Sequence, residues 1–431
     1  MHECMTNPYL VDSYGADPTG ATASDTAVAA AIAALGTAHG IVEFGIGTYR
    51  LDSTQTLAHA GQYFQGQGLN VTTIDYRGTG PGLKCWDSTV SPDGLSAPGH
   101  GGGILGGLTI DGTNNSNANS IGLQIGDLVN PVAERIRIVS FLNAGSIGFL
   151  GQNRYSWTEY GTFDITSEFN TNCLVLESHP SHPRPYGGKS SWSYNSFDFG
   201  FIAEANQNGL IVRNDVEATG VHWVMAFNAN PGATNTGVAI TVGTSATDDS
   251  HIDGYLSWYG ESTTPGAVAH KDINVGAIAS LRGYGALVFN SFSAAFVAGT
   301  AVPYRVVFAG RVNCPSLGHY AESEIPFVTI GDPGRFGALG DSANYINIEE
   351  GGSGGWPQLV ARGPSEHIGI NIVAKGFGSV QANGVPVGYR ADSPPSSATA
   401  SGTPGQIAFD QSYLYICVGT NTWKRTAIAS W

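Results

Sequence analysis

The feature that most constrains the fold is a repeat of about 27 residues built from alternating apolar and polar positions. The segments IRIVSFLNAGSIGF (136–149) and FDITSEFNTNCLVL (163–176) carry similar residues at matching places. The matched pairs are Ile136 and Phe163, Ile138 and Ile165, Asn143 and Asn170, Ile147 and Leu174, and Phe149 and Leu176. A repeat of this length made of period-2 strands predicts one coil of a parallel β-solenoid per repeat, with alternate side chains stacked inside.

Further copies extend the repeat in both directions. Leu108 and Ile110 precede it by one coil, and FDFGFIAEANQNGLIV (197–212) follows it after an intervening loop. The register then predicts columns of equivalent side chains on successive coils. We expect a structural amide column of Asn143, Asn170 and Asn206, an outer column of Arg137, Asp164 and Asp198, and an opposite-charge column of Glu177 and Arg213.

The segment DSYGADPTGATASDTAVAAAIAAL (12–35) reads as a loop that opens into a helix. Asp25 or Ser24 can accept amide hydrogens of the first turn, and Val28, Ile32 and Leu35 fall on one face. The first coil of a solenoid exposes an apolar lumen and an unpaired strand edge, so we expect this helix to cover it. The 17–20 loop is then a turn and needs no ligand.

Composition excludes several classes of partner. The chain has 431 residues, 60 glycines, 12% charged residues and a formal net charge of -15, which suits a sheet protein with many turns. Without a basic field, nucleic acid is a poor partner, and no apolar run predicts membrane insertion. Five dispersed cysteines favour reduced or buried thiols over a disulfide framework or a zinc site. The start of the chain lacks a secretory signal pattern, so we expect synthesis in a host cytoplasm.

Breaks in the pattern predict four parts. We expect an N-terminal cap and first strands at 1–60 and a solenoid body at 61–315, in which 216–315 either continues the solenoid or forms a separate β-sandwich. A β-rich stem or trimerisation segment at 316–392 follows. A linker and a three-stranded hairpin module complete the chain at 393–431, with turns at 411–412 and 421–422.

The run YGADPTGATASDTAVAAAIAAL followed by IVEFGIGTYRL resembles the N-terminal signature of the pectate-lyase-like right-handed β-helix superfamily, as found in bacteriophage tail spikes and tail fibres. The segments 369–388 and 404–428 resemble C-terminal parts of phage tail proteins. The resemblance implies an all-β fold with a capping helix, a homotrimer, and a place in the virion tail beside other tail proteins. It also implies a bacterial envelope glycan as the partner.

The outer column nominates the candidate catalytic residues. Asp164 and Asp198 should stand on neighbouring coils, and glycoside cleavage needs two carboxyl groups about 5–5.5 Å apart for retention or 6.5–9.5 Å apart for inversion. Stacked like charges should also raise one pKa, as a general acid requires. Glu159 and Glu168 are candidate helpers. The alternative is a solvated face on which Arg137 compensates both aspartates.

A proline- and glycine-rich loop at 179–190 should lie beside this column. Candidate glycan-binding residues there and nearby are Trp157, Tyr160, Trp192, His179 and His182. No metal site is assigned, although the stretch DDSHID offers calcium ligands at Asp248, Asp249 and Asp253 without the spacing of an EF-hand loop. A solvated turn is the alternative for that stretch.

Three functions remain open at this level. The preferred one is a tail spike or fibre that binds a bacterial cell-surface polymer, most simply a glycan, during host attachment. The second is an endo-acting glycan depolymerase on the same scaffold, a glycoside hydrolase before a lyase. The third is a purely structural tail component. Fold alone does not choose among them.

Overall fold

A computed structural model gives the fold of the chain. It describes residues 8–86, 98–179, 190–204, 207–230, 237–262, 271–276, 278–290, 292, 305–313, 323–330, 345–349, 358–362, 381–382, 385–386, 394–402 and 404–429. The chain divides into two compact units between residues 343 and 344.

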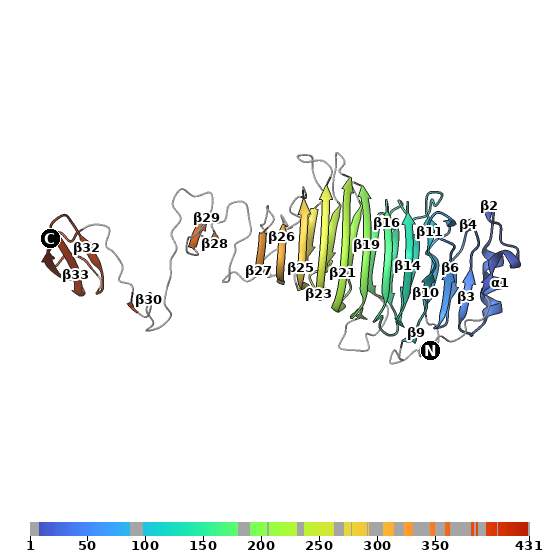
Figure 1. Ribbon diagram of the computed structural model, residues 1–431, viewed down its shortest axis with the longest axis horizontal. Coiled ribbons are helices and arrows are strands. Elements are labelled where there is room, and N and C mark those ends of the chain that lie inside the picture. Colours follow the sequence, from blue (N-terminus) through green and yellow to red (C-terminus); the bar gives the residue numbers. More distant parts are fainter. Residues whose placement is uncertain are drawn as a thin grey trace. The chain divides into compact units, whose positions relative to one another are not determined.

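The first unit is a parallel β-solenoid whose coils stack as successive rungs (Figure 1). In its larger sheet the early coils contribute two short strands each: β3 (Gly40–Glu43) and β4 (Gly47–Leu51), β6 (Gln62–Gln65) and β7 (Thr72–Tyr76), and β10 (Gly103–Leu105) and β11 (Leu108–Asp111). Later coils contribute one longer strand: β14 (Val132–Val139), β16 (Thr162–Glu168), β19 (Ser196–Glu204), β21 (Val216–Asn230), β23 (His251–Ser262), β25 (Ser280–Asn290) and β26 (Arg305–Asn313).

A second parallel sheet closes the coils. Its strands are β5 (Gln55–Leu57), β8 (Pro81–Trp86), β12 (Ile121–Gly126), β15 (Ile147–Asn153), β17 (Asn172–Ser178), β20 (Asn208–Arg213), β22 (Val238–Val242) and β24 (Lys271–Val275). The unit also has the short strands β1 (Tyr9–Leu10), β2 (Thr19–Ala23), β9 (Gly99–His100), β13 (Leu128–Val129) and β18 (Ser190–Ser191). The longer β27 (Ser323–Ile330) pairs with β26 in antiparallel orientation. The expected right-handed β-helix fold class is confirmed.

The register of the clearest repeat differs from the expected one by two residues. Ile136 pairs with Ile165 and not with Phe163, and Phe149 pairs with Leu174 and not with Leu176. β14 carries a bulge of one extra residue between Ala133 and Ile136, where two short strands of earlier coils merge into one, and after it paired residues are 29 positions apart instead of the expected 27. Because the shift is even, every inward side chain stays inward. The pairings expected for the coil before and the coil after are confirmed.

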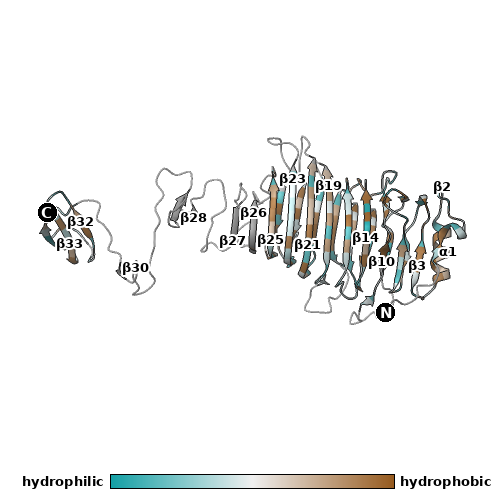
Figure 2. Cartoon of the chain, viewed as in Figure 1, coloured by the Kyte–Doolittle hydropathy of each residue, from teal (hydrophilic) through white to brown (hydrophobic). Residues whose placement is uncertain are grey.

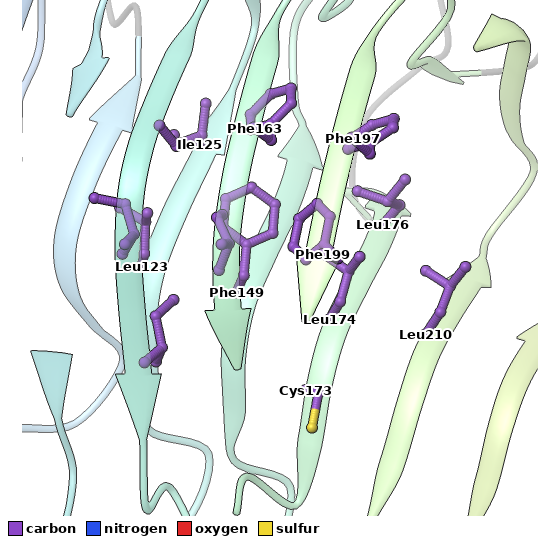
Figure 3. Packing of buried hydrophobic residues seen from close by; sticks show 14 of the residues in the cluster. Leu123, Ile125, Phe149, Phe163, Cys173, Leu174, Leu176, Phe197, Phe199 and Leu210 are labelled. Atoms are coloured by element: carbon purple, nitrogen blue, oxygen red, sulfur yellow. The ribbon is translucent and has the colours of Figure 1, made fainter. Parts of the chain in front are cut away.

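Stacked aromatic and aliphatic side chains fill the lumen between the sheets (Figure 3). Phe163 and Phe197 stack with ring centroids 5.1 Å apart, and Phe149 meets Phe163 edge-on at 5.8 Å. The strands of the solenoid accordingly alternate between apolar and polar colours in Figure 2. Each large ring removes roughly 150–250 Å² of surface from water, so this column dominates the stability of the central coils.

The helix α1 (Asp25–Leu35) covers the first coil, after the short 3-10 helix η1 (Val11–Tyr14). Val28 and Leu35 are buried and Ile32 packs against the core, as expected for a cap. The expected N-terminal capping bond is wrong, since neither Ser24 nor Asp25 caps the helix with its side chain.

The Asp25 carboxylate instead accepts the amides of Asp52 and Ser53 on the next coil, at 3.0 and 2.7 Å. It therefore joins the cap to the solenoid. In the preceding loop, Asp17 accepts the amides and hydroxyls of Thr19 and Thr22, so its carboxylate holds the turn that leads into β2.

Side-chain columns tie the coils together. The side-chain NH₂ group of Asn170 donates to the backbone carbonyl of Ile138 at 3.0 Å, and its side-chain oxygen accepts the backbone N–H of Phe141 at 2.9 Å. The side-chain NH₂ group of Asn143 donates to the backbone carbonyl of Asn115 at 2.7 Å. Asn206, the third expected member, lies outside the described residues. Glu177 and Arg213 pair at 2.6 Å, as the expected charge column requires.

The solenoid continues through the stretch for which two folds were open. β21, β23, β25 and β26 pair in parallel, one after another, in the sheet that holds β19. The strands described within 216–315 therefore do not form a separate sandwich. The expected boundaries at 60, 315 and 392 stay predictions.

The described residues of the second unit form two hairpins and a small sheet. The hairpins are β28 (Tyr345–Glu349) with β29 (Gln358–Arg362) and β30 (Gln381–Ala382) with β31 (Val385–Pro386). The sheet is a three-stranded antiparallel meander of β32 (Ile407–Phe409), β33 (Tyr413–Gly419) and β34 (Thr422–Ala427), packed around Tyr415, Cys417 and Trp423. Among the helices of the described residues, none has the length and apolar character needed to cross a membrane.

Candidate functional site

Two aspartates face each other in register on the outer face of the larger sheet. Asp164 on β16 pairs with Asp198 on β19, and both side chains are exposed. The flanking residues Phe163, Ile165, Phe197 and Phe199 are buried, which fixes both carboxylates outward by the alternation of the strand. Adjacent strands lie about 4.8 Å apart, so the two carboxyl groups are close neighbours.

This arrangement changes the acidity of Asp164. Partial burial, and next the negative charge of Asp198, raise the pKa of the Asp164 carboxyl above its ordinary value. Contacts to Arg135 act in the opposite direction. A carboxyl group with a raised pKa retains its proton at higher pH, as a general acid must.

The expected compensation by Arg137 is wrong. Arg137 is in register with Thr166 and not with Asp164, and its guanidinium binds the Glu168 carboxylate at 2.6 Å. The Glu168 side chain is mostly buried, at 13% exposure, and so is committed to this ion pair. It lies four residues beyond Asp164 on β16 and holds the strand pair together.

An aromatic pair stands on the same two coils. The rings of Tyr160 and Tyr194 stack with centroids 5.3 Å apart and an interplanar angle of 11°, and the residues are 56% and 52% exposed. Both residues adopt a left-handed backbone, with φ of 57° and 59°, at the turn that leads into each strand. Each tyrosine precedes the aspartate of its own coil by four positions.

Small residues lie between and beyond these two pairs. Thr162 and Ser196 are in register between the tyrosines and the aspartates, and Thr166 and Gly200 are in register on the other side of the aspartates. Gly200 has no side chain, so little projects from β19 at this point of the outer surface. The arrangement is a surface with two exposed rings at one end, two carboxylates near its middle and hydroxyl groups between them.

Other residues expected at the site have different environments. Trp192 is fully buried and its ring lies 6.1 Å from that of Phe163, so its expected role as a sugar-stacking surface is wrong. Glu159 is half-buried and accepts the Ser191 hydroxyl at 2.6 Å. Trp157 is half-buried in the turn before β16. His179 follows β17 of the opposite sheet, and His182 lies outside the described residues.

Asp248 of the candidate calcium stretch is a structural anchor. Its buried carboxylate accepts the amides of Asn214, Asp215 and Thr244 at 3.0, 3.0 and 2.8 Å, and the Ser250 hydroxyl at 2.6 Å. Asp249 donates its amide to Asp215, and Asp253 lies in register with Thr219 and Arg282. Across the described part of the chain, no three His, Cys, Asp or Glu side chains gather as a metal site would require. Calcium binding here stays a prediction.

Sequence reasoning missed Tyr194, the partner of Tyr160. The signal was present, because Tyr160 and Tyr194 stand at the same separation as Asp164 and Asp198. It also missed three outward rings on β21, β23 and β25, namely His222, Tyr255 and Tyr284. Those coils differ in length, so no constant repeat marks them.

Comparisons with known proteins add short but specific similarities. No family model matches the chain. Over 41 residues, 10% of its length, the chain is 51% identical to a depolymerase of Klebsiella phage K5-2 described as specific for capsule K30/K69. A depolymerase of Klebsiella phage K64-1, described in the same way, is 57% identical over 37 residues, or 9% of the chain. Each match spans only 5% of the relative's length.

Solved structures align over most of the chain at low identity. ORF18 of Geobacillus virus E2 aligns over 98% of this chain and 86% of its own, with 15% identity and a TM-score of 0.44. An exopolygalacturonase of Thermotoga maritima aligns over 76% and 95%, with 12% identity and a TM-score of 0.29.

The strand pairing and the capping helix define the chain as a parallel β-solenoid protein. Together with the phage depolymerase similarities, they confirm its resemblance to bacteriophage tail spikes of the pectate-lyase-like right-handed β-helix superfamily.

Proposed function

We propose that this chain is the glycan-binding part of a phage tail spike and attaches to a bacterial cell-surface polysaccharide through the outer face of β16 and β19. The observation that carries the proposal is the side-by-side placement of two matched pairs, Asp164 with Asp198 and Tyr160 with Tyr194. Exposed rings pack against the apolar face of a sugar, and carboxylates and hydroxyls bind its hydroxyl groups.

The phage relatives support the choice of ligand. Both are described as depolymerases specific for capsule K30/K69, so capsular polysaccharide is the first ligand class to test. We place the protein in the virion tail, as a homotrimer in contact with other tail proteins. Light scattering of the purified protein should then give three times the chain mass of 44.9 kDa.

Binding is tested directly with immobilised capsular polysaccharide of serotypes K30 and K69, and with encapsulated and capsule-free Klebsiella cells. We expect retention on the polysaccharide and on encapsulated cells. Absence of binding to both polysaccharides and to both kinds of cell contradicts the proposal and favours a purely structural tail component. Binding to capsule-free cells alone would move the ligand from the capsule to another envelope polymer.

A second function, endo-acting depolymerisation, is favoured by the spacing and acidity of the aspartate pair. A strand separation of about 4.8 Å is close to the 5–5.5 Å between the carboxyl groups of retaining glycosidases and shorter than that of inverting ones. The raised pKa of Asp164 fits the general acid, which leaves Asp198 as the nucleophile.

Cleavage is followed by new reducing ends, with absorbance of unsaturated sugars as the readout for a lyase. We expect retained anomeric configuration by NMR, and a loss of about 10²–10⁴ in rate for Asp164→Asn and for Asp198→Asn. If the protein binds the polysaccharide and no product forms, it acts as an adhesin and not as a depolymerase. Product formation that survives both substitutions would remove these residues from the chemistry.

A further inference from the structure

A second exposed aromatic feature lies on later coils of the same face. His222 on β21, Tyr255 on β23 and Tyr284 on β25 are in register and form what we call the ring row. His222 and Tyr255 stack with centroids 4.8 Å apart and planes 15° apart, and Tyr255 meets Tyr284 edge-on at 5.5 Å. The rings therefore form a continuous line along the solenoid axis.

Packing inside the protein does not require these rings. Their inward neighbours Trp223 and Leu256 are fully buried and supply the core of these coils. His222 is exposed, Tyr255 is half-buried between its two neighbours, and Tyr284 is 58% exposed. Cross-strand ring contacts contribute about 0.2–1 kcal/mol each, whereas exposing an apolar ring to water is unfavourable, so a line of open rings indicates a bound partner.

The ring row continues the site of β16 and β19. Ser196, between Tyr194 and Asp198 on β19, is in register with His222. Thr162, Ser196 and the ring row thus form a single line of equivalent positions over five consecutive strands of the sheet. Asp198 is in register with Val224, two residues after His222, so its carboxylate is a diagonal neighbour of the first ring, at about 7–8 Å.

We propose that the ring row binds consecutive pyranose units of a linear polysaccharide that extends from the aspartate pair along the solenoid axis. This inference rests on the proposed function and gives it a direction and a length. The chemistry fits a sugar chain, because rings present apolar faces while Ser196, Ser257 and Asp198 offer hydroxyl and carboxylate partners at their edge.

Ligand length provides the test. Capsular polysaccharide of serotype K30 and its size-fractionated fragments serve as probes of the full chain. The substitutions are Tyr255→Ala with Tyr284→Ala, and separately His222→Ala. Tyr14→Ala is the matched control, because Tyr14 is 38% exposed in η1 beside the cap.

We expect the double variant to bind long fragments roughly tenfold more weakly and fragments too short to reach the ring row as well as wild type does. The Tyr14 variant should bind both as wild type does. Equal binding of long fragments by wild type and the double variant overturns the inference, and so does an equal loss for short and long fragments.

Tyr255→Leu with Tyr284→Leu repeats the test with bulk retained, should the alanine variant fold poorly, and its expected length dependence is the same. The two proposals fail differently. If wild type binds no polysaccharide, the proposed function fails, whereas binding by wild type that is indifferent to the ring row overturns only this inference.

Discussion

Tyr160 and Tyr194 stack face to face on consecutive coils, with centroids 5.3 Å apart and more than half of each residue exposed. Both hold a left-handed backbone conformation that is uncommon for residues with a side chain. Two exposed rings in a strained turn gain little for the fold, so their arrangement is better explained by what they present to a ligand.

Replacing Tyr194 by alanine should weaken polysaccharide binding by roughly tenfold, because one ring face and the stacking that holds Tyr160 in place are both lost. Tyr194→Phe should bind nearly as wild type does, because the ring remains. Surface plasmon resonance on immobilised polysaccharide measures both. Unchanged affinity of the alanine variant would show that the pair does not touch the ligand.

Asp164→Asn should raise the thermal midpoint at pH 7 by roughly 1–2 °C while it lowers function. The pKa of Asp164 is raised by partial burial and by the charge of Asp198. Between the ordinary and the raised pKa the folded state binds more protons than the unfolded state, so stability from this group falls as pH rises through that window and stays lower above it. At about pH 3 both states are largely protonated and the variant should gain little.

The matched control for that prediction is Glu168→Gln. Glu168 is paired with Arg137, so its loss should lower the midpoint at pH 7 and cannot raise it. Calorimetry at both pH values separates the two variants. A lower midpoint of the Asp164 variant at pH 7 would contradict the unfavourable interaction between the two aspartates.

The solenoid architecture could be predicted from the sequence because inward-facing apolar residues alternate with outward-facing ones and the pattern recurs once per coil. Residue pairs on either side of a loop, such as Phe163 with Phe197 and Leu174 with Leu210, were predicted in the observed register. The pairing of Ile136 was not, because its expected partner Phe163 and its observed partner Ile165 lie two residues apart on the same face of β16, so both registers satisfy the apolar alternation. Registers that differ by an even number of residues bury the same side chains.

The site was predictable only where a single separation relates all the equivalent residues of two neighbouring coils. Asp164 and Asp198 were found from their shared separation, and Tyr194 could have been found from Tyr160 in the same way. Trp192 could not be placed correctly, since a tryptophan in a turn between coils can face either solvent or lumen, and here it fills the lumen. The same holds for Asp248, whose donors come from turns far apart in the sequence.

Asp248→Asn should lower the free energy of unfolding by roughly 2–4 kcal/mol, because a buried acceptor of several amides would then present an amide group to them. Burial opposes ionisation, but the Ser250 hydroxyl and the surrounding amides together lower the pKa of Asp248. Its stabilisation is therefore complete above the ordinary pKa and is lost as pH falls through the lowered one.

The same measurement addresses calcium. If Asp248 is only an anchor, calcium and a chelator should leave the wild-type midpoint unchanged, and Asp249→Asn and Asp253→Asn should unfold nearly as wild type does. A rise in the midpoint with calcium that either of these two substitutions abolishes would instead establish a calcium site at this turn.

Two glycines on the larger sheet should differ strongly in their tolerance of alanine. Gly254 has φ of 153°, and a Cβ there would lie 2.1 Å from the Val221 carbonyl oxygen, so Gly254→Ala should cost roughly 2–4 kcal/mol of folding free energy. Gly200 lies beside the aspartate pair, and a Cβ there would meet Thr166 at an ordinary 3.6 Å. Gly200→Ala should therefore change stability by less than about 0.5 kcal/mol.

Gly200→Phe should also fold, because the new side chain would point to solvent. The ring would project from the surface next to Asp198 and should weaken polysaccharide binding by roughly tenfold or more. Chemical denaturation and binding are measured on the same preparations of all three variants. Full binding by a folded Gly200→Phe variant would place the ligand elsewhere on the solenoid. Loss of binding with an unchanged midpoint would locate it at this low point of the surface.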